Sequence, residues 1–251
     1  MPARFPDHFS PVAADYARFR PRYPAALFDW LALIAPAWRR AWDCGTGNGQ
    51  AAVALAERFD DVVATDPSGA QLRTAAPHPR VAYVRAAAER APLADGTCDL
   101  VTVAQALHWF DRPAFFAECS RVLKPGGVLV AWGYQDIVMP DPALAAANDA
   151  LQDELRAYWP PQRVLIDEAY AGFEWPFPAV RAPEFALRAQ WTLPRLLGYF
   201  ASYSATQRFR AANGTDPVAA HAPALAAAWG DPETAREVRW PLFVHARRKP
   251  A

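Results

Sequence analysis

The stretch with the clearest chemical signature is residues 43–49, which run Asp-Cys-Gly-Thr-Gly-Asn-Gly. An apolar run that ends at Trp42 precedes it, and residues 50–57 have helical composition, so the pattern predicts a strand, a glycine loop and a helix. Alternate glycines allow a tight turn with positive φ and let a flat ligand approach the backbone. A carboxylate beside the loop gives a pyrophosphate no advantage, but it attracts a cation. Asp43 therefore predicts a ligand with a cationic or amine-bearing group.

A second acidic residue, Asp66, ends a β-branched run at residues 62–66. It lies about 20 residues beyond the first glycine, where an acid at the end of a second parallel strand accepts hydrogen bonds from ribose hydroxyls. A helix N-cap would explain Asp66 by itself, but not its pairing with the glycine loop. The two acids together predict a nucleoside ligand.

A histidine, His108, lies in the polar and aromatic turn at residues 105–111. The turn follows residues 98–104, a nearly continuous apolar run that is typical of a central parallel strand covered on both faces. Ligands of such sheets bind at the carboxyl ends of the strands. His108 is thus a candidate general base or substrate-orienting group, and the alternative is a structural role in the turn.

The alternation of strand and helix patterns around these residues predicts an α/β fold. Strand patterns lie at residues 62–66, 81–85, 98–104 and 128–132, with helical patterns between them. Such alternation favours right-handed βαβ units on a parallel sheet.

Composition argues against several classes of protein. Lys+Arg and Asp+Glu both number 26 in a chain of 251 residues, so we expect no nucleic-acid partner. Three scattered cysteines do not suggest a disulfide framework and fit a cytoplasmic location. We also expect no membrane partner, because no apolar run approaches the roughly 20 residues of a membrane span. No cluster of acidic, histidine or cysteine residues has metal-ligand spacing, so we predict no metal.

Taken together, the motifs resemble the class I S-adenosylmethionine-dependent methyltransferases. The resemblance covers roughly residues 40–135 and is carried by the glycine loop, Asp66, Ala88-Glu89, the turn at 105–111 and the Arg-Val-Leu-Lys-Pro-Gly-Gly run at 121–127. The run Tyr-Ala-Arg-Phe-Arg-Pro-Arg-Tyr-Pro at 16–24 and His-Trp-Phe at 108–110 narrow it toward small-molecule enzymes similar to trans-aconitate methyltransferases.

The resemblance implies a Rossmann-like fold. We expect a doubly wound, mainly parallel seven-stranded sheet whose last strand is antiparallel, with an N-terminal lid and a helical insertion near the C-terminus. The expected segments of this single domain are a cap or lid at 1–36, a cofactor-binding core at 37–135, a substrate-recognition insertion at 136–235 and the last strand at 236–251.

Roles for individual residues follow from the same resemblance. Asp43 would lie near the methionine amine of S-adenosylmethionine, and Asp66 would bind the ribose. Tyr16 and Arg20 would close over the cofactor, with Arg22 as a competing partner of the methionine carboxylate. The full set of predicted cofactor contacts is Tyr16, Arg20, Asp43, Gly45, Thr46, Gly47, Gly49, Asp66, Pro67, Ala88, Glu89, Gln105 and Ala106, of which Ala88 and Glu89 would hold the adenine and Gln105 and Ala106 the methionine portion.

The reaction implied is in-line methyl transfer to a small molecule, with S-adenosylhomocysteine as product. Alignment and exclusion of water supply much of its rate enhancement. An oxygen of a carboxylate or hydroxyl is the expected acceptor. A carboxylate, ionised above about pH 4, needs no base, whereas a phenol or alcohol benefits from one. The candidate substrate contacts are Trp109, Tyr134, Tyr199, Ser202 and Tyr203, although core packing also explains aromatic residues. Arg195 or Arg188 could pair with a substrate carboxylate.

Two other functions stay open at this point. A nicotinamide-dependent oxidoreductase is disfavoured because the loop runs Gly-x-Gly-x-Gly behind an acid rather than Gly-x-Gly-x-x-Gly. A non-catalytic nucleoside-binding protein would keep the same fold without turnover.

The turn at 105–111 lacks an Asp/Asn-Pro-Pro-aromatic sequence, the arrangement that resembles the amino methyltransferases of DNA and glutamine. Methylation of nucleic-acid nitrogen is therefore disfavoured. We expect a monomer or a homodimer.

Overall fold

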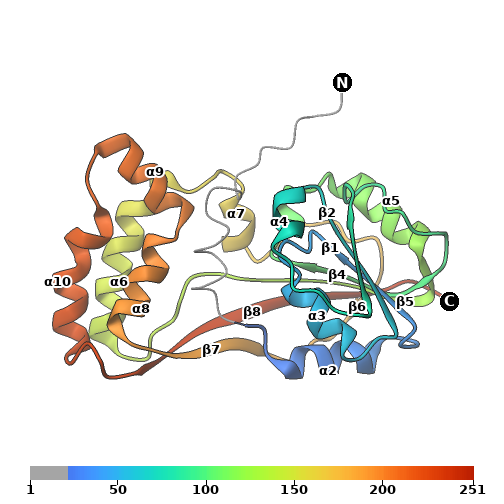
Figure 1. Ribbon diagram of the computed structural model, residues 1–251, viewed down its shortest axis with the longest axis horizontal. Coiled ribbons are helices and arrows are strands. Elements are labelled where there is room, and N and C mark those ends of the chain that lie inside the picture. Colours follow the sequence, from blue (N-terminus) through green and yellow to red (C-terminus); the bar gives the residue numbers. More distant parts are fainter. Residues whose placement is uncertain (1–21) are drawn as a thin grey trace.

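A parallel sheet organises the structure, a computed structural model that describes residues 22–251 (Figure 1). Its parallel strands lie in the order β3-β2-β1-β4-β5. They are β1 (Arg40–Cys44), β2 (Asp61–Asp66), β3 (Val81–Arg85), β4 (Cys98–Ala104) and β5 (Leu123–Tyr134). The crossovers place the carboxyl ends of all five strands at one edge, which is where the glycine loop and the turn at 105–111 begin.

The C-terminal strand β8 (Arg236–Arg248) pairs antiparallel with β5. Its other edge is shared end to end by β6 (Ala179–Val180) and β7 (Phe185–Trp191), both antiparallel to it. The doubly wound, mainly parallel class and the antiparallel last strand are therefore confirmed. The sheet has eight strands rather than seven, because two short strands occupy its seventh position.

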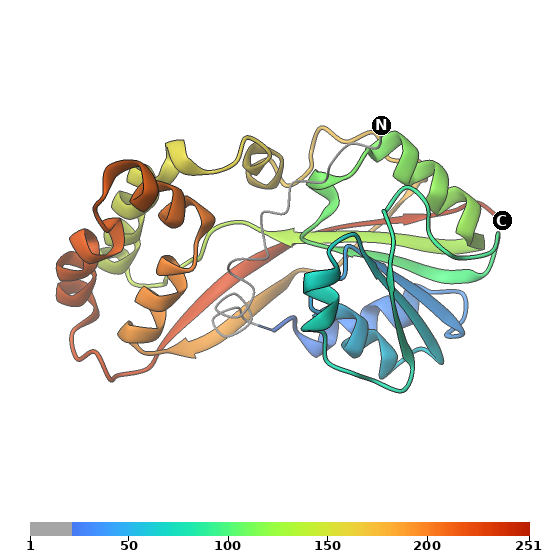
Figure 2. The same cartoon turned by 45° about the horizontal axis from the view of Figure 1, so that its top comes forward.

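Helices cover both faces of the sheet. On one face lie α2 (Ala25–Ile34) and α3 (Gln50–Ala56), and on the other lies α5 (Arg112–Val122), while α4 (Gly69–Arg73) lies near β3 (Figures 1 and 2). Successive strand residues point to opposite faces. Leu100 and Val128 accordingly pack with α2 and α3, whereas Val101 and Leu129 pack with α5.

A helical lobe, defined here as α6, α8, α9 and α10, stands apart from the sheet (Figures 1 and 2). Its helices are α6 (Pro142–Leu155), α8 (Leu193–Ala201), α9 (Ser204–Asn213) and α10 (Pro217–Trp229). Long extensions of β7 and β8 connect it to the sheet, and the short helix α7 (Arg163–Asp167) lies between the two parts. Two 3₁₀ turns complete the fold, η2 (Leu107–Trp109) and η3 (Arg156–Tyr158).

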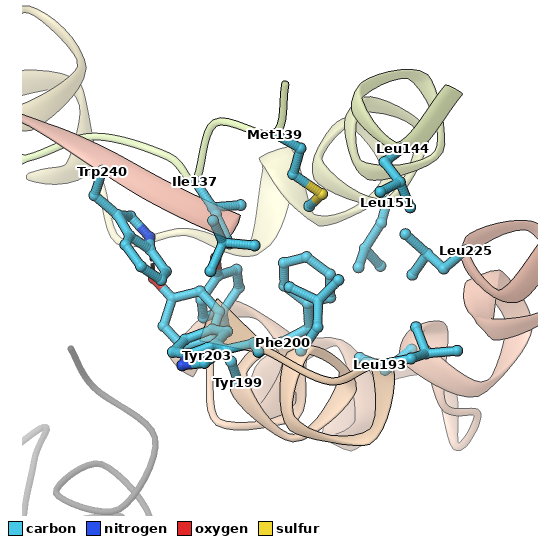
Figure 3. Close-up of a cluster of buried hydrophobic side chains, with 14 of the residues drawn as sticks. Ile137, Met139, Leu144, Leu151, Leu193, Tyr199, Phe200, Tyr203, Leu225 and Trp240 are labelled. Carbon is cyan, nitrogen blue, oxygen red and sulfur yellow. Dashed lines mark hydrogen bonds between the residues drawn. The ribbon is translucent and has the colours of Figure 1, made fainter. Parts of the chain in front are cut away.

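The helical lobe has its own apolar core, which Figure 3 shows in close-up. Leu144 and Leu151 of α6 meet Leu225 of α10, and Phe200 of α8 lies among them. Each fully buried side chain of this size contributes roughly 1.5–3 kcal/mol to stability. The helical insertion expected near the C-terminus is thus a packed unit rather than a loop.

Residues 193–209 have the composition of one helix, but the structure divides them between α8 and α9. Ser202 ends α8, and its hydroxyl donates to the carbonyl of Tyr199 at 2.6 Å. Tyr203 is extended and precedes α9. A hydrogen bond from a side-chain hydroxyl to the helix backbone competes with continuation of the helix, and apolar periodicity alone does not reveal it.

Within residues 22–251, no helix is long and apolar enough to cross a bilayer.

Candidate active site

The glycine loop joins β1 to α3 at the carboxyl edge of the sheet. Gly45, Gly47 and Gly49 all have positive φ, at +67°, +55° and +81°, and Gly49 is the N-cap of α3. A Cβ at Gly45 would lie 2.8 Å from the Cβ of Ala106 in the turn after β4. At Gly47 the nearest atom would be 3.9 Å away. Gly45 is therefore required for packing, and Gly47 leaves room for a ligand.

This difference predicts how alanine substitutions act on stability. Gly45→Ala combines a strained φ with a clash, so we expect it to lower the free energy of unfolding by about 3 kcal/mol. Gly126→Ala is the matched control, because its φ is +75° and nothing lies within 4 Å of the added Cβ. Strain alone should cost about 1 kcal/mol there. Urea unfolding measures both, and equal losses would contradict the packing role of Gly45.

Asp43, at the end of β1, is completely buried. Its two carboxylate oxygens accept hydrogen bonds from the hydroxyls of Thr46 at 2.6 Å and Thr102 at 2.8 Å. Burial raises the pKa of Asp43 to about 6, although both hydroxyls oppose the rise. A cation that reached this carboxylate would stabilise its charged form. Contact of Asp43 with an amine stays a prediction.

Asp66, at the end of β2, connects two loops of this edge. Its carboxylate accepts the backbone N–H of Gly47 at 2.9 Å and that of Ser68 at 2.8 Å. The N-cap of α4 is Ser68 rather than Asp66, since the Ser68 hydroxyl oxygen accepts from the N–H of Gln71 at 3.3 Å. Helix capping therefore does not explain Asp66, and its position next to the glycine loop does.

The loops after β3 and β4 are also joined. Glu89 accepts the backbone N–H of Asp111 at 3.1 Å, and Ala88 beside it is buried. On the other side, the carbonyl of Pro67 accepts from Arg85 at 3.0 Å. All the described residues predicted to contact the cofactor thus belong to the strand ends and loops of one edge. The Glu89 side chain, however, is engaged in fixing the turn.

The turn at 105–111 holds Gln105 in an unusual backbone conformation. Gln105 has a positive φ of +53°, and its side-chain amide pairs with both backbone groups of Tyr134, at 2.9 and 3.1 Å. A non-glycine residue with positive φ is uncommon and is often part of a functional site. Gln105 also lines the cavity described below, and the contact of Gln105 and Ala106 with the methionine portion stays a prediction.

His108 lies in η2 of the same turn, with its Nδ1 3.0 Å from the hydroxyl of Tyr170. Burial, together with the positive charge of Arg163, lowers the pKa of His108 to about 4. The imidazole is therefore neutral at physiological pH.

A cavity of about 110 Å³ lies between this turn and the insertion. Its volume exceeds the space of a single water and suits a small molecule. Four of the five predicted substrate residues line it together with His108, namely Trp109, Tyr134, Tyr199 and Tyr203. Ser202 is buried and does not line it, whereas Ser204 does.

Comparison with known proteins identifies the family. Residues 42–131 match the family model described as a methyltransferase domain. A protein described as a methyltransferase in Dictyostelium discoideum is 32% identical over 219 residues, which is 86% of this chain and 83% of that protein. The chain belongs to the class I S-adenosylmethionine-dependent methyltransferases. Its likeness to trans-aconitate methyltransferases in particular stays a prediction.

Two further relatives agree with this assignment. The structure of a protein described as a type II methyltransferase from Anaeromyxobacter dehalogenans is 45% identical, with a TM-score of 0.89 over 93% of this chain and all of that one. An uncharacterized methyltransferase of Mycobacterium bovis is 41% identical over 130 residues, about half of each chain. The methyltransferase fold thus includes the helical lobe and not only the sheet.

One cavity residue of this methyltransferase had no signal in the sequence. Arg163 of α7 pairs with Asp136 at 2.8 Å and with Asp167 at 2.6 Å, and it stacks over Trp159. The region around it is irregular and rich in proline, so no periodicity marks it. Arg163 lines the cavity as its one cation among the described residues.

The arginines suggested by the sequence lie elsewhere. Arg188 pairs with Glu237 at 3.1 Å, and Arg195 lies over the ring of Trp191; neither lines the cavity. Tyr16 and Arg20 fall outside the described residues. Arg22, the first residue that the structure describes, is exposed. Between residues 22 and 251, no group of acidic, histidine or cysteine side chains could hold a metal ion.

Proposed function

We propose that this methyltransferase transfers the methyl group to a carboxylate oxygen of a small organic acid held in the cavity beside His108. The observation that carries the proposal is a neutral histidine of low pKa next to a largely buried arginine. That pair can bind and orient an anion, but it is poorly suited to removing a proton.

The cofactor residues fit S-adenosylmethionine. Asp43 suits the amine because burial has raised its pKa, Gly47 leaves room at the loop, and Asp66 lies where ribose hydroxyls would be expected. When bound, S-adenosylmethionine supplies a methyl group on a positively charged sulfur, so that transfer forms a C–O bond, breaks the C–S bond, leaves its electron pair on sulfur and releases no proton. The protein then has to align the acceptor and exclude water.

The pKa of His108 decides between acceptors. A phenol has a pKa near 10, so moving its proton to His108 would be uphill by about six pKa units, or about 8 kcal/mol. A carboxylate is already ionised and needs no such transfer. His108 therefore fits an orienting role better than that of a general base.

Arg163 provides the charge that such an acceptor needs. Its Nε and Nη2 bind Asp167 and Asp136, while its Nη1 makes no hydrogen bond within the described part of the chain. Both carboxylates are about half exposed and hence screened by solvent, whereas the Arg163 side chain is 15% exposed. At His108 the positive charge of Arg163 consequently outweighs the two negative charges, and it lowers the pKa of the imidazole.

Oxygen as acceptor also agrees with one relative. A malonyl-[acyl-carrier protein] O-methyltransferase from a Marinomonas species is 37% identical over 135 residues, about half of each chain. Its name states an oxygen acceptor for that protein.

The test is a screen of carboxylic acids, phenols, amines and thiols with cofactor labelled in the methyl group. Methyl esters release labelled methanol in mild base, whereas phenol ethers and methylated amines do not. We expect base-labile label with one or more small acids. Label that appears only in base-stable products would overturn the acceptor assignment.

Asp43 gives cofactor affinity an expected pH dependence. The pKa of Asp43 is about 6 in the ligand-free protein and is lower once an amine cation is bound, so binding favours the deprotonated carboxylate. Affinity for S-adenosylhomocysteine should be full above about pH 6 and fall up to about tenfold per pH unit below it. Calorimetric titrations between about pH 5 and pH 7, where the amine stays protonated, measure it. A constant affinity across that range would contradict the contact.

A further inference from the structure

We propose that Tyr170 is a positioning residue that holds His108 in one tautomer, with the proton on Nε2, so that His108 donates a hydrogen bond into the substrate cavity. The hydroxyl of Tyr170 lies 3.0 Å from Nδ1 of His108. Nothing in the sequence pattern links these residues, which lie 62 positions apart.

The direction of this hydrogen bond follows from burial. The side chain of Tyr170 is 1% exposed, and among the described residues His108 is the one hydrogen-bond partner of its hydroxyl. Burial also raises the pKa of Tyr170 well above its usual range, which keeps the phenol protonated. If Nδ1 donated instead, the phenol proton would be buried without an acceptor, an unfavourable arrangement. Nδ1 therefore accepts, and a neutral imidazole then carries its proton on Nε2.

The backbone around Tyr170 is held in an unusual conformation. Ala169 and Tyr170 both have positive φ, +50° and +59°, directly after α7. Two contacts stabilise this turn, since His245 of β8 donates from Nε2 to the carbonyl of Ala169 at 2.6 Å, and the Tyr170 ring stacks on Phe173. Strained backbone persists where its surroundings over-determine it, and it clusters at functional sites. Here it brings the hydroxyl to Nδ1.

This arrangement gives the cavity two donors of different charge. Nε2 of His108 has no partner among the described residues and is not sealed from solvent, and His108 lines the cavity with Arg163. One segment positions both donors, because α7 carries Arg163 and is followed by the turn that contains Tyr170. The assignment of a carboxylate acceptor rests on the proposed function, whereas the tautomer does not.

Side-chain ¹⁵N NMR of the histidines tests the tautomer without any substrate. His108→Asn identifies the signals of this residue among the five histidines. We expect a protonated Nε2 and an unprotonated, hydrogen-bonded Nδ1 in the wild type, and mixed tautomers in Tyr170→Phe. Tyr158→Phe is the matched control, because its hydroxyl bonds to Asn213 and should leave His108 unchanged. A wild-type His108 with its proton on Nδ1 would overturn the proposal, whether or not the variant folds.

Kinetics separate positioning from general support of the fold. With an acid found in the acceptor screen, Tyr170→Phe should raise KM for the acceptor about tenfold, the loss of one hydrogen bond, and leave the Kd for S-adenosylhomocysteine unchanged. In a His108→Ala background the same substitution should have no further effect on KM. An equal loss in both backgrounds would show that Tyr170 does not act through His108. If the screen finds no acid acceptor, the proposed function fails while the NMR result still decides the tautomer.

Discussion

Asparagine in place of Asp43 is expected to weaken binding of S-adenosylhomocysteine about 10- to 100-fold while the protein stays folded. Asn keeps the size of the side chain, and its carbonyl can still accept from Thr46 or Thr102. What it lacks is the negative charge, and a hydrogen bond to a charged group is worth about 1.5–3 kcal/mol.

The same substitution should not lower the stability of the ligand-free protein. The folded-state pKa of Asp43 lies above its ordinary value of 3.8, so between pH 3.8 and about 6 the native state holds a proton that the unfolded state has lost. Stability from this group therefore falls as pH rises through that window, and at pH 7 the buried charge costs about 3 kcal/mol. Removing the charge relieves this cost. We expect Asp43→Asn to be at least as stable as the wild type at pH 7.

Equilibrium dialysis with labelled cofactor measures the affinity, and urea unfolding measures the stability. Asp61→Asn is the matched control, because Asp61 lies at the start of β2 and pairs with Arg40 away from the glycine loop. Full affinity in Asp43→Asn would contradict contact between Asp43 and the amine and would favour a generic nucleotide-binding loop.

The second large effect is expected from Arg163→Gln. Removing the cation should raise KM for the acid acceptor about 30-fold, the equivalent of about 2 kcal/mol for a charge-assisted hydrogen bond. The Kd for the cofactor should not change, because Arg163 belongs to α7 and not to the loops predicted to bind the cofactor. The pKa of His108 should rise as well, since the Arg163 charge is one of the two causes that lower it.

Initial-rate kinetics measure the acceptor KM, equilibrium dialysis measures the cofactor Kd, and histidine NMR measures the pKa of His108. Arg188→Gln is the control, an exposed arginine that pairs with Glu237 outside the cavity. An unchanged acceptor KM in Arg163→Gln, or an equal rise in Arg188→Gln, would show that Arg163 does not bind the acceptor.

The carboxyl edge of the sheet could be predicted because its signals are local. Alternating glycines, a β-branched run that ends in Asp66 and an apolar run before His108 each specify an element and its end. Once the strands are parallel, topology brings these ends together. The structure confirms that edge, including the pairing of Asp66 with the glycine loop.

What could not be predicted depends on contacts between distant segments. Arg163 lies in a short helix without periodicity, and Tyr170 reaches His108 only because β8 and Phe173 hold a strained turn. The side chain of Gln105 is bound to Tyr134 on the neighbouring strand, a contact that no local pattern indicates. The deciding pairs Arg163–Asp136, Gln105–Tyr134 and His108–Tyr170 lie 27, 29 and 62 positions apart, beyond the reach of a local pattern.

Calorimetric titration of the wild-type protein with S-adenosylhomocysteine and, separately, with a nicotinamide dinucleotide tests the proposed cofactor site most directly. The proposed site is the carboxyl edge around Asp43, Gly47 and Asp66, which would hold an amino acid joined to adenosine. We predict binding of one S-adenosylhomocysteine per chain and none of the dinucleotide. Binding of the dinucleotide alone, or of neither ligand, would contradict it.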